Sequence, residues 1–146
     1  METRRLSKKD ATQVAEVIGD AFSGPPWHED WSNAERLAQY VDEGLDGANA
    51  LAFGLFQDEL LVAVAMGRVR HWHNRVEFIL EDVCVRQAQQ GRGLGTILLS
   101  KVEEACRALA IDEIGLRTRQ DAGAYHFYEK QGFIVQEMDV YFTKKL

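Results

Sequence analysis

Residues 76–96 read VEFILEDVCVRQAQQGRGLGT, and this stretch decides the fold of the 146-residue chain. Its first ten residues form a nearly continuous apolar run that Glu81 and Asp82 interrupt. Such a run predicts a strand near the centre of a sheet, covered on both faces. Three glycines then fall within five residues, at 91, 93 and 95, and helical spacing follows over residues 96–110. We therefore expect a buried strand that enters a helix through a glycine turn.

Outward from this stretch, apolar spacing predicts the remaining helices and strands. Helical periods cover residues 10–22, 32–45 and 122–131, with Ser32 and Asp121 as N-caps and Gly132 ending the last helix. Strand patterns cover residues 50–56, 60–69, 113–118 and 133–144. The order predicts one α+β domain over residues 1–146, layered α/β/α, with a mixed sheet of six to seven strands and about four helices.

Composition limits the classes of partner. Acidic residues outnumber basic ones by 23 to 17, and no basic cluster suggests a nucleic-acid-binding face. No apolar stretch approaches membrane length, and residues 1–10 lack a signal-peptide pattern, so we expect a cytoplasmic protein without a membrane partner. His71 and His73 lack an evident third ligand, so no metal is expected.

The glycine turn has the chemistry of an anion site. Glycines let the backbone adopt positive φ, and a helix N-terminus presents unpaired N–H groups with a positive dipole end. The spacing is not G-x-G-x-x-G, because Leu98 stands at the last position, and it lacks the Gly-Lys-Ser/Thr ending of a P-loop. The turn therefore predicts a pyrophosphate ligand outside those two classes.

Three segments resemble the GNAT superfamily of acyl-CoA N-acyltransferases. Gln90-x-x-Gly93-x-Gly95 is similar to the Q/R-x-x-G-x-G/A signature, and residues 80–85 look like the strand that precedes it. Residues 124–133 resemble the later A-x-x-F-Y-x-x-x-G-F pattern. The resemblance spans nearly the whole chain and implies the GNAT fold and an acetyl-CoA-dependent N-acetyltransferase.

The resemblance also implies a cofactor site for acetyl-CoA. Main-chain amides of the turn bind the pyrophosphate of coenzyme A in this family, which points to Gln90, Gly91, Arg92, Gly93, Gly95 and Thr96. The strand before the turn pairs with the pantetheine arm, a role that falls to Val83, Cys84 and Val85. Asp121 stands where many relatives carry an asparagine that contacts the cofactor, although a carboxylate cannot donate the same hydrogen bond.

Direct transfer needs a base, because an alkylamine has a pKa of about 10 and must lose a proton before it attacks. Glu81 is our first choice as base or amine anchor, with Asp82, Glu77 or a water chain as alternatives. A structural acid paired with Arg68 or Arg70 is the competing interpretation of Glu81. By resemblance, Tyr128 protonates the leaving thiolate.

The acceptor stays open between small-molecule and peptide amines. Residues 27–31 are a candidate substrate rim, and a homodimer is possible. A catalytically inactive acyl-CoA-binding or sensing module of the same fold is the alternative function.

Overall fold

A computed structural model describes all 146 residues as four α-helices packed on one five-stranded sheet. The strands are β1 (Glu2–Arg5), β2 (Ala50–Gln57), β3 (Leu60–His71), β4 (Val76–Val85) and β5 (Glu113–Leu116). The helices are α1 (Ala11–Ser23), α2 (Ala34–Leu45), α3 (Leu94–Ala108) and α4 (Gly123–Lys130), with short 3-10 helices at Lys8–Asp10 and Gln87–Gln89. None of the helices is long and apolar enough to cross a membrane.

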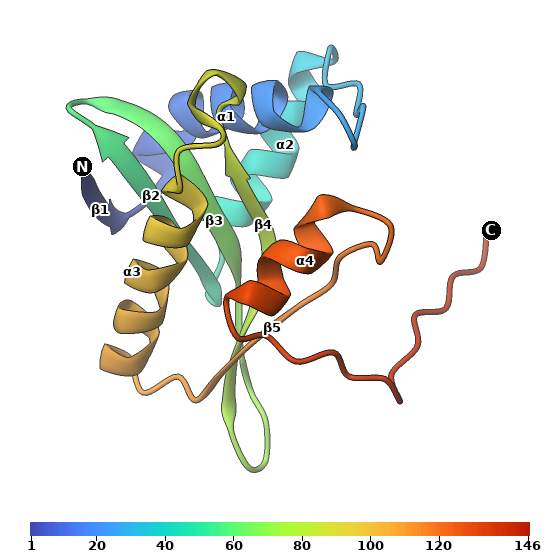
Figure 1. The fold of residues 1–146 in the computed structure, drawn as a ribbon. Coiled ribbons are helices and arrows are strands. Elements are labelled where there is room, and N and C mark those ends of the chain that lie inside the picture. The colour runs from blue at the N-terminus through green and yellow to red at the C-terminus, as the bar shows by residue number, and fades with distance from the viewer.

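The helices cover the sheet from both sides, as expected for an α/β/α arrangement (Figure 1). One core cluster joins α1 and α2 to the sheet, and the other joins α3 to the opposite face, with part of α4 packed against it. Residues 61–66 of β3 are all buried, because this central strand has a helix layer on each side. The predicted α+β fold is confirmed.

Strand pairing opens a gap in the sheet beside the end of β4. The strand order is β1-β2-β3-β4-β5, antiparallel except for the parallel pair of β4 and β5. That parallel pair runs only from Glu77–Glu113 to Leu80–Leu116. Residues 81–85 of β4 therefore continue with β3 on one side and no strand on the other.

A bulge in β4 changes which face its side chains occupy. Met66 of β3 pairs with Asp82, whereas the next residue, Gly67, pairs with Leu80, so Glu81 is the extra residue. Before the bulge, Phe78 and Leu80 pack on the α3 side. After it, Asp82 and Cys84 face the α1/α2 side. A regular strand would have kept residues 80, 82 and 84 on one face.

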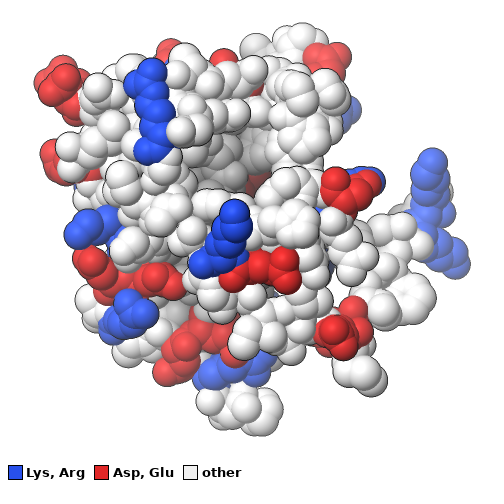
Figure 2. Space-filling model, viewed as in Figure 1, with Lys and Arg blue, Asp and Glu red and all other residues white.

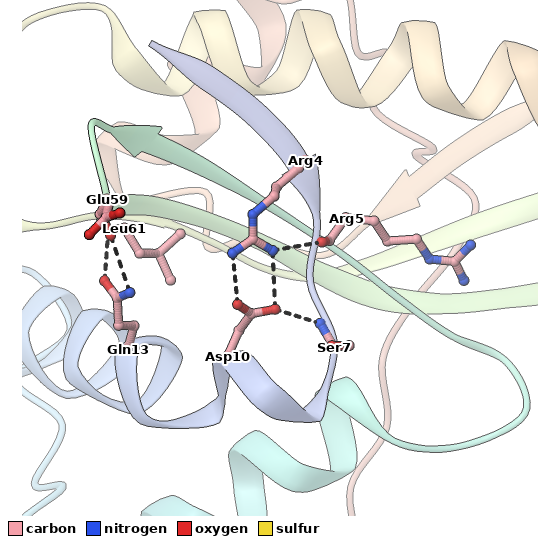
Figure 3. Close-up of polar contacts among 7 residues, drawn as sticks. All are labelled: Arg4, Arg5, Ser7, Asp10, Gln13, Glu59 and Leu61. Atoms are coloured by element: carbon pink, nitrogen blue, oxygen red, sulfur yellow. Dashed lines mark hydrogen bonds and ion pairs between the residues drawn. The ribbon is translucent and has the colours of Figure 1, made fainter.

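A buried carboxylate fastens β1 to the start of α1. Asp10 is only 8% exposed and receives two hydrogen bonds from the Arg4 guanidinium, at 2.9 and 3.3 Å (Figure 3). The Ser7 N–H donates to the same carboxylate at 2.9 Å. The hydrogen bonds from Arg4 are the main cause that lowers the pKa of Asp10 below its usual value, against the opposing effect of burial.

We expect Asp10→Asn to lower the free energy of unfolding by about 1–2 kcal/mol at pH 7, because Arg4 is partly exposed and screened by water. Since the pKa of Asp10 is lower in the folded chain, its stabilisation is present above pH 4 and disappears as pH falls through the folded pKa. The difference in free energy of unfolding between the natural chain and the variant, measured by urea unfolding, should become smaller as the pH is lowered. Asp139→Asn, at an exposed position, is the control; equal stabilities at pH 7 would contradict the role of Asp10.

Three local predictions are wrong. Residues 133–144 form no strand and have no strand partner, so the sheet has five strands, slightly fewer than the six to seven expected. The N-cap of α2 is Asn33, whose side-chain oxygen accepts from the Arg36 N–H at 3.1 Å, whereas the Ser32 N–H turns back to Asp30. Asp121 does not cap α4, because its carboxylate is engaged by Arg119 at 2.8 and 2.9 Å.

Candidate active site

The glycine turn presents a row of unpaired main-chain donors. Gly91 and Gly93 have φ values of +77° and +75°, which side-chain-bearing residues rarely adopt. Gly93 is the N-cap of α3, and the first helical hydrogen bond is donated by Ile97 to the Gly93 carbonyl at 3.2 Å. The six N–H groups of residues 91–96 donate to no protein acceptor. They form an anion-binding surface, which the helix dipole reinforces.

The side chains of the turn mainly hold its shape. Gln90 donates to the Val85 carbonyl at 3.0 Å, which ties the turn to the end of β4. The Thr96 hydroxyl accepts from Gln131 at 3.0 Å, and a Cβ on Gly95 would lie 3.2 Å from Phe127. These two contacts join the start of α3 to α4. Arg92 is exposed and donates to the Gln89 side chain at 3.2 Å, at the rim of the turn.

Main-chain groups of β4 face the gap in alternation. The Arg86 N–H donates to the Val62 carbonyl at 2.9 Å, which marks residues 62 and 86 as a hydrogen-bonded pair. In an antiparallel ladder such pairs alternate, so Cys84 turns its main-chain groups to β3. The main-chain N–H and carbonyl groups of Val83 and Val85 point to the opposite side, where β5 no longer runs beside β4. The gap therefore offers the main-chain groups of Val83 and the N–H of Val85 next to the glycine turn, whereas the Val85 carbonyl accepts from Gln90.

The surface is hollowed at this place. Figure 2 shows a recess between the end of β4 and α4, with acidic atoms in red at its floor. The recess thus lies by the open strand edge and has an acidic floor.

Asp82 is the carboxylate with an unusual environment here. Burial raises the pKa of Asp82 to about 6; the hydrogen bond from Tyr40 works against this rise, and the charges of Glu81 and Glu29 add to it. The Tyr40 hydroxyl lies 2.7 and 2.8 Å from the two carboxylate oxygens. A carboxyl group with such a pKa can exchange a proton near neutral pH.

Tyr40 links this carboxylate to the loop before α2. Its ring packs against Trp31 at 4.9 Å between centroids, and the Trp31 indole N–H donates to Glu29 at 2.8 Å. Part of the predicted rim, residues 27–31, is thereby connected to Asp82. Sequence reasoning did not identify Tyr40, because a single tyrosine on an amphipathic helix carries no local signal of its partner.

The structure separates the three acidic candidates of β4. Glu81, our first choice as base or amine anchor, lies at the bulge, is 42% exposed and pairs with Arg68 at 3.2 Å, as the competing interpretation of this residue expects. Glu77 lies at the opposite end of the strand, where it accepts from the Trp72 indole at 2.9 Å. Asp82 combines burial with a place on the part of β4 that β5 leaves unpaired.

Tyr128 and Cys84 share the surroundings of Asp82. Burial raises the pKa of Tyr128 to about 12, and the nearby groups Cys84 and Asp82 contribute to the rise. Tyr128 packs edge-on against Phe127 and Phe133, at 5.3 and 5.5 Å between centroids. Burial also raises the pKa of the Cys84 thiol well above its usual range, so Cys84 stays a neutral, unreactive side chain.

Asp121 stands apart from these groups. It is exposed, and its carboxylate forms a bidentate pair with Arg119. That pair lowers the pKa of Asp121. Both carboxylate oxygens of Asp121, a predicted cofactor residue, therefore already accept hydrogen bonds from a protein group.

Sequence comparison identifies a family and one relative that matches over a short segment. Residues 13–133 match the sequence model of the Acetyltransferase (GNAT) family. A 65-residue segment is 38% identical to the uncharacterized protein YxbD of Bacillus subtilis strain 168. That segment covers 41% of this chain and 41% of the relative.

Solved structures share the fold over nearly the full length. A possible acetyltransferase from Clostridium difficile 630 superposes with a TM-score of 0.84 at 16% identity, covering 99% of this chain and 97% of that one. The aminoglycoside N-acetyltransferase AAC(6')-Iy in complex with CoA superposes with a TM-score of 0.77 at 16% identity, covering 99% and 95%. At such identities the likeness concerns the fold alone.

Proposed function

Because this chain belongs to the GNAT family of acetyltransferases, we propose that it transfers the acetyl group of acetyl-CoA directly to a primary amine. The observation that carries this proposal is the row of six unpaired N–H groups at residues 91–96, beside an open strand edge. Pyrophosphate fits the first feature, and the amide-bearing pantetheine arm fits the second.

In this proposal, the cofactor is held mainly by main-chain groups. The amides of the turn bind the pyrophosphate, and Arg92 at the rim adds a positive charge. Val83 and the N–H of Val85 pair with the pantetheine arm as a neighbouring strand would, because the Val85 carbonyl already accepts from Gln90. One of their N–H groups faces the thioester oxygen and stabilises the charge that develops there. Cys84 supports this edge from within the core, and Asp121 contributes at most an indirect contact.

Asp82 serves as the base. It accepts a proton from the bound ammonium group, directly or through water, and the free amine attacks the thioester carbonyl. A C–N bond forms as the C–S bond breaks, and the second proton of the nitrogen leaves to water as the amide forms. The hydroxyl of Tyr40 orients the carboxylate, and Glu81 at the neighbouring bulge attracts the cationic amine.

Tyr128 serves as the acid. With a pKa of about 12 it remains protonated at neutral pH. It can therefore donate its proton to the sulfur of coenzyme A as the thiolate leaves. Its buried ring, packed between Phe127 and Phe133, keeps the hydroxyl in place.

The acceptor class we propose is a small cationic amine. Glu29 and Glu81 both lie close enough for their charges to act on Asp82. Clustered acidic side chains favour a ligand with positive charge. The similarity in fold to an aminoglycoside N-acetyltransferase supports an amine-bearing small molecule.

We place the protein in the cytoplasm. Both cysteines, Cys84 and Cys106, are free and buried. Free thiols persist in reducing compartments, where disulfides are rare. A net charge of −6 supports solubility in that compartment.

The test is a thiol-release assay with acetyl-CoA and a panel of amines that includes a polyamine, an aminoglycoside, an amino sugar and a lysine peptide. We expect amine-dependent release of coenzyme A and an N-acetyl product by mass spectrometry. The rate should rise with pH through about 6, as Asp82 loses its proton. The dimethylated form of each active amine is the control, because it cannot form a neutral amide.

Two outcomes would contradict the enzyme assignment. Tight acetyl-CoA binding without thiol release for any amine would favour a sensing module of the same fold. Absence of any coenzyme A binding in calorimetry would remove the basis for both functions.

A further inference from the structure

The connection from β4 to α3 is hydrogen-bonded to the end of α1, beside which it lies (Figure 1). Gln87, two residues after β4, opens the short 3-10 helix that leads to the glycine turn. Its main-chain N–H donates to the Asp20 carboxylate at 2.7 Å, and its side-chain amide donates to the Asp20 carbonyl at 2.6 Å. One residue of the connection thus holds α1 by two short hydrogen bonds, across 67 residues of sequence.

The Gln87 side chain also lies directly against Gly24, the buried residue that follows α1. A Cβ atom on Gly24 would lie 2.8 Å from Gln87 Oε1 and 2.9 Å from Gln87 Cδ. Gly24 has φ −86° and ψ 177°, an extended conformation that any residue can adopt. The close approach of Gln87 is therefore the reason that glycine suits this position.

Gly24 is also the first residue of the loop over residues 24–31. Its carbonyl accepts hydrogen bonds from the N–H groups of Trp27 and His28, at 3.2 and 3.0 Å. The first turn of the loop is thus built on the residue that Gln87 contacts. A contact between one side chain and Gly24 therefore sets where the loop leaves α1.

The other end of the loop is connected to β4 through Tyr40. Trp31 packs against the Tyr40 ring, and the Tyr40 hydroxyl donates to Asp82 of β4. The charge of Glu29, within the loop, acts on Asp82 as well. The loop is thus tied at one end to Asp82 and at the other to Gln87, five residues further along the same chain segment.

We infer that Gln87 is a positioning residue for the amine acceptor, because its side chain holds the loop over residues 24–31 beside Asp82. The inference rests on the acetyl transfer proposed above, in which Asp82 takes a proton from the bound amine. Gln87 acts through the loop, which carries Glu29 and Trp31. When the side-chain contact is lost, the first turn of the loop is released and the amine binds more weakly.

The first test is Gln87→Ala, which should raise KM for the amine by about three- to tenfold, the effect expected of one lost hydrogen bond. Alanine keeps the N–H that donates to Asp20, so the connection to the glycine turn stays in place. The Kd for acetyl-CoA and kcat should therefore stay within about twofold. Steady-state kinetics and calorimetry measure the three values, and an unchanged KM would overturn the inference.

Gly24→Ala tests the same contact from the other side. The added methyl group displaces the end of the Gln87 side chain, so this variant should raise KM by a similar factor. The double variant Gly24→Ala/Gln87→Ala should be no worse than either single variant, because both remove one contact. Gly19→Ala is the control, since its Cβ would lie at an ordinary 3.5 Å from Leu37. Additive losses in the double variant would contradict the shared contact.

Tryptophan fluorescence follows the loop without any reaction, so it tests the inference separately from the proposed function. In a Trp72→Phe background the only tryptophans are Trp27 and Trp31, which both lie in the loop. Gln87→Ala and Gly24→Ala should increase the quenching of their emission by acrylamide, and Gly19→Ala should not. Quenching equal to that of the background protein would overturn the inference even if the chain acetylates amines. If no amine is acetylated while quenching increases, the acetyl transfer fails and the hold of Gln87 on the loop stands.

Discussion

Asp82→Asn is expected to lower kcat/KM for the amine by about 10²–10⁴-fold, the usual contribution of a positioned base. Asparagine keeps the shape of the side chain and can still accept from Tyr40, but it cannot take up a proton. The pKa of Asp82 is about 6, so the activity of the natural chain should rise as pH increases through 6. The variant should lose this step in a pH profile of kcat/KM.

Glu81→Gln is the matched control, since it removes a carboxylate from the adjacent residue. Glu81 is exposed and paired with Arg68, so its loss should raise KM for a cationic amine at low salt and leave kcat within a few-fold. If instead Glu81→Gln removes the step near pH 6 and Asp82→Asn keeps it, the base is Glu81. Acetyl-CoA affinity should be unchanged in both proteins.

Tyr128→Phe should reduce kcat by about 10²-fold with little change in the Kd for acetyl-CoA. The substitution preserves ring packing against Phe127 and Phe133 and removes only the hydroxyl that protonates sulfur. The cofactor contacts we propose are main-chain contacts, which the change does not touch. Steady-state kinetics and calorimetry on the same preparation separate the two effects.

Tyr125→Phe, one turn earlier on α4, is the control and should behave like the natural chain. An unchanged kcat in Tyr128→Phe would remove Tyr128 from the mechanism. A large loss of acetyl-CoA affinity would instead make Tyr128 a structural part of the cofactor site.

Much of the fold was predictable because its signals are local. The strand at residues 76–85 was predicted with the bounds it has in the structure, and the helices at 10–22 and 96–110 lie within two residues of α1 and α3. Apolar periodicity reports which face of a segment meets a core, and it needs no knowledge of the partner. The glycine turn was equally readable, since positive φ at 91 and 93 is a property of the residues themselves.

Caps were less predictable than the elements they begin. Ser32 and Asn33 are both good N-cap residues, and the choice between them depended on a turn with Asp30. An aspartate such as Asp121 can cap a helix, but its carboxylate instead accepts two hydrogen bonds from Arg119. In each case a hydrogen bond between close neighbours in the chain decided whether the predicted residue serves as the cap.

By itself, the sequence determined the layered α+β fold, the glycine turn and the set of acidic candidates on β4. Only the tertiary structure decided which acid is buried, because the bulge at Glu81 arises from register with Gly67 on another strand. It also brought Tyr40 to Asp82 across 42 residues and left residues 133–144 without a strand partner. Apolar periodicity depends only on residues that are neighbours in the chain. The register of β4 against β3, the burial of Asp82 and the pairing of a strand edge depend on segments that lie far apart in the sequence.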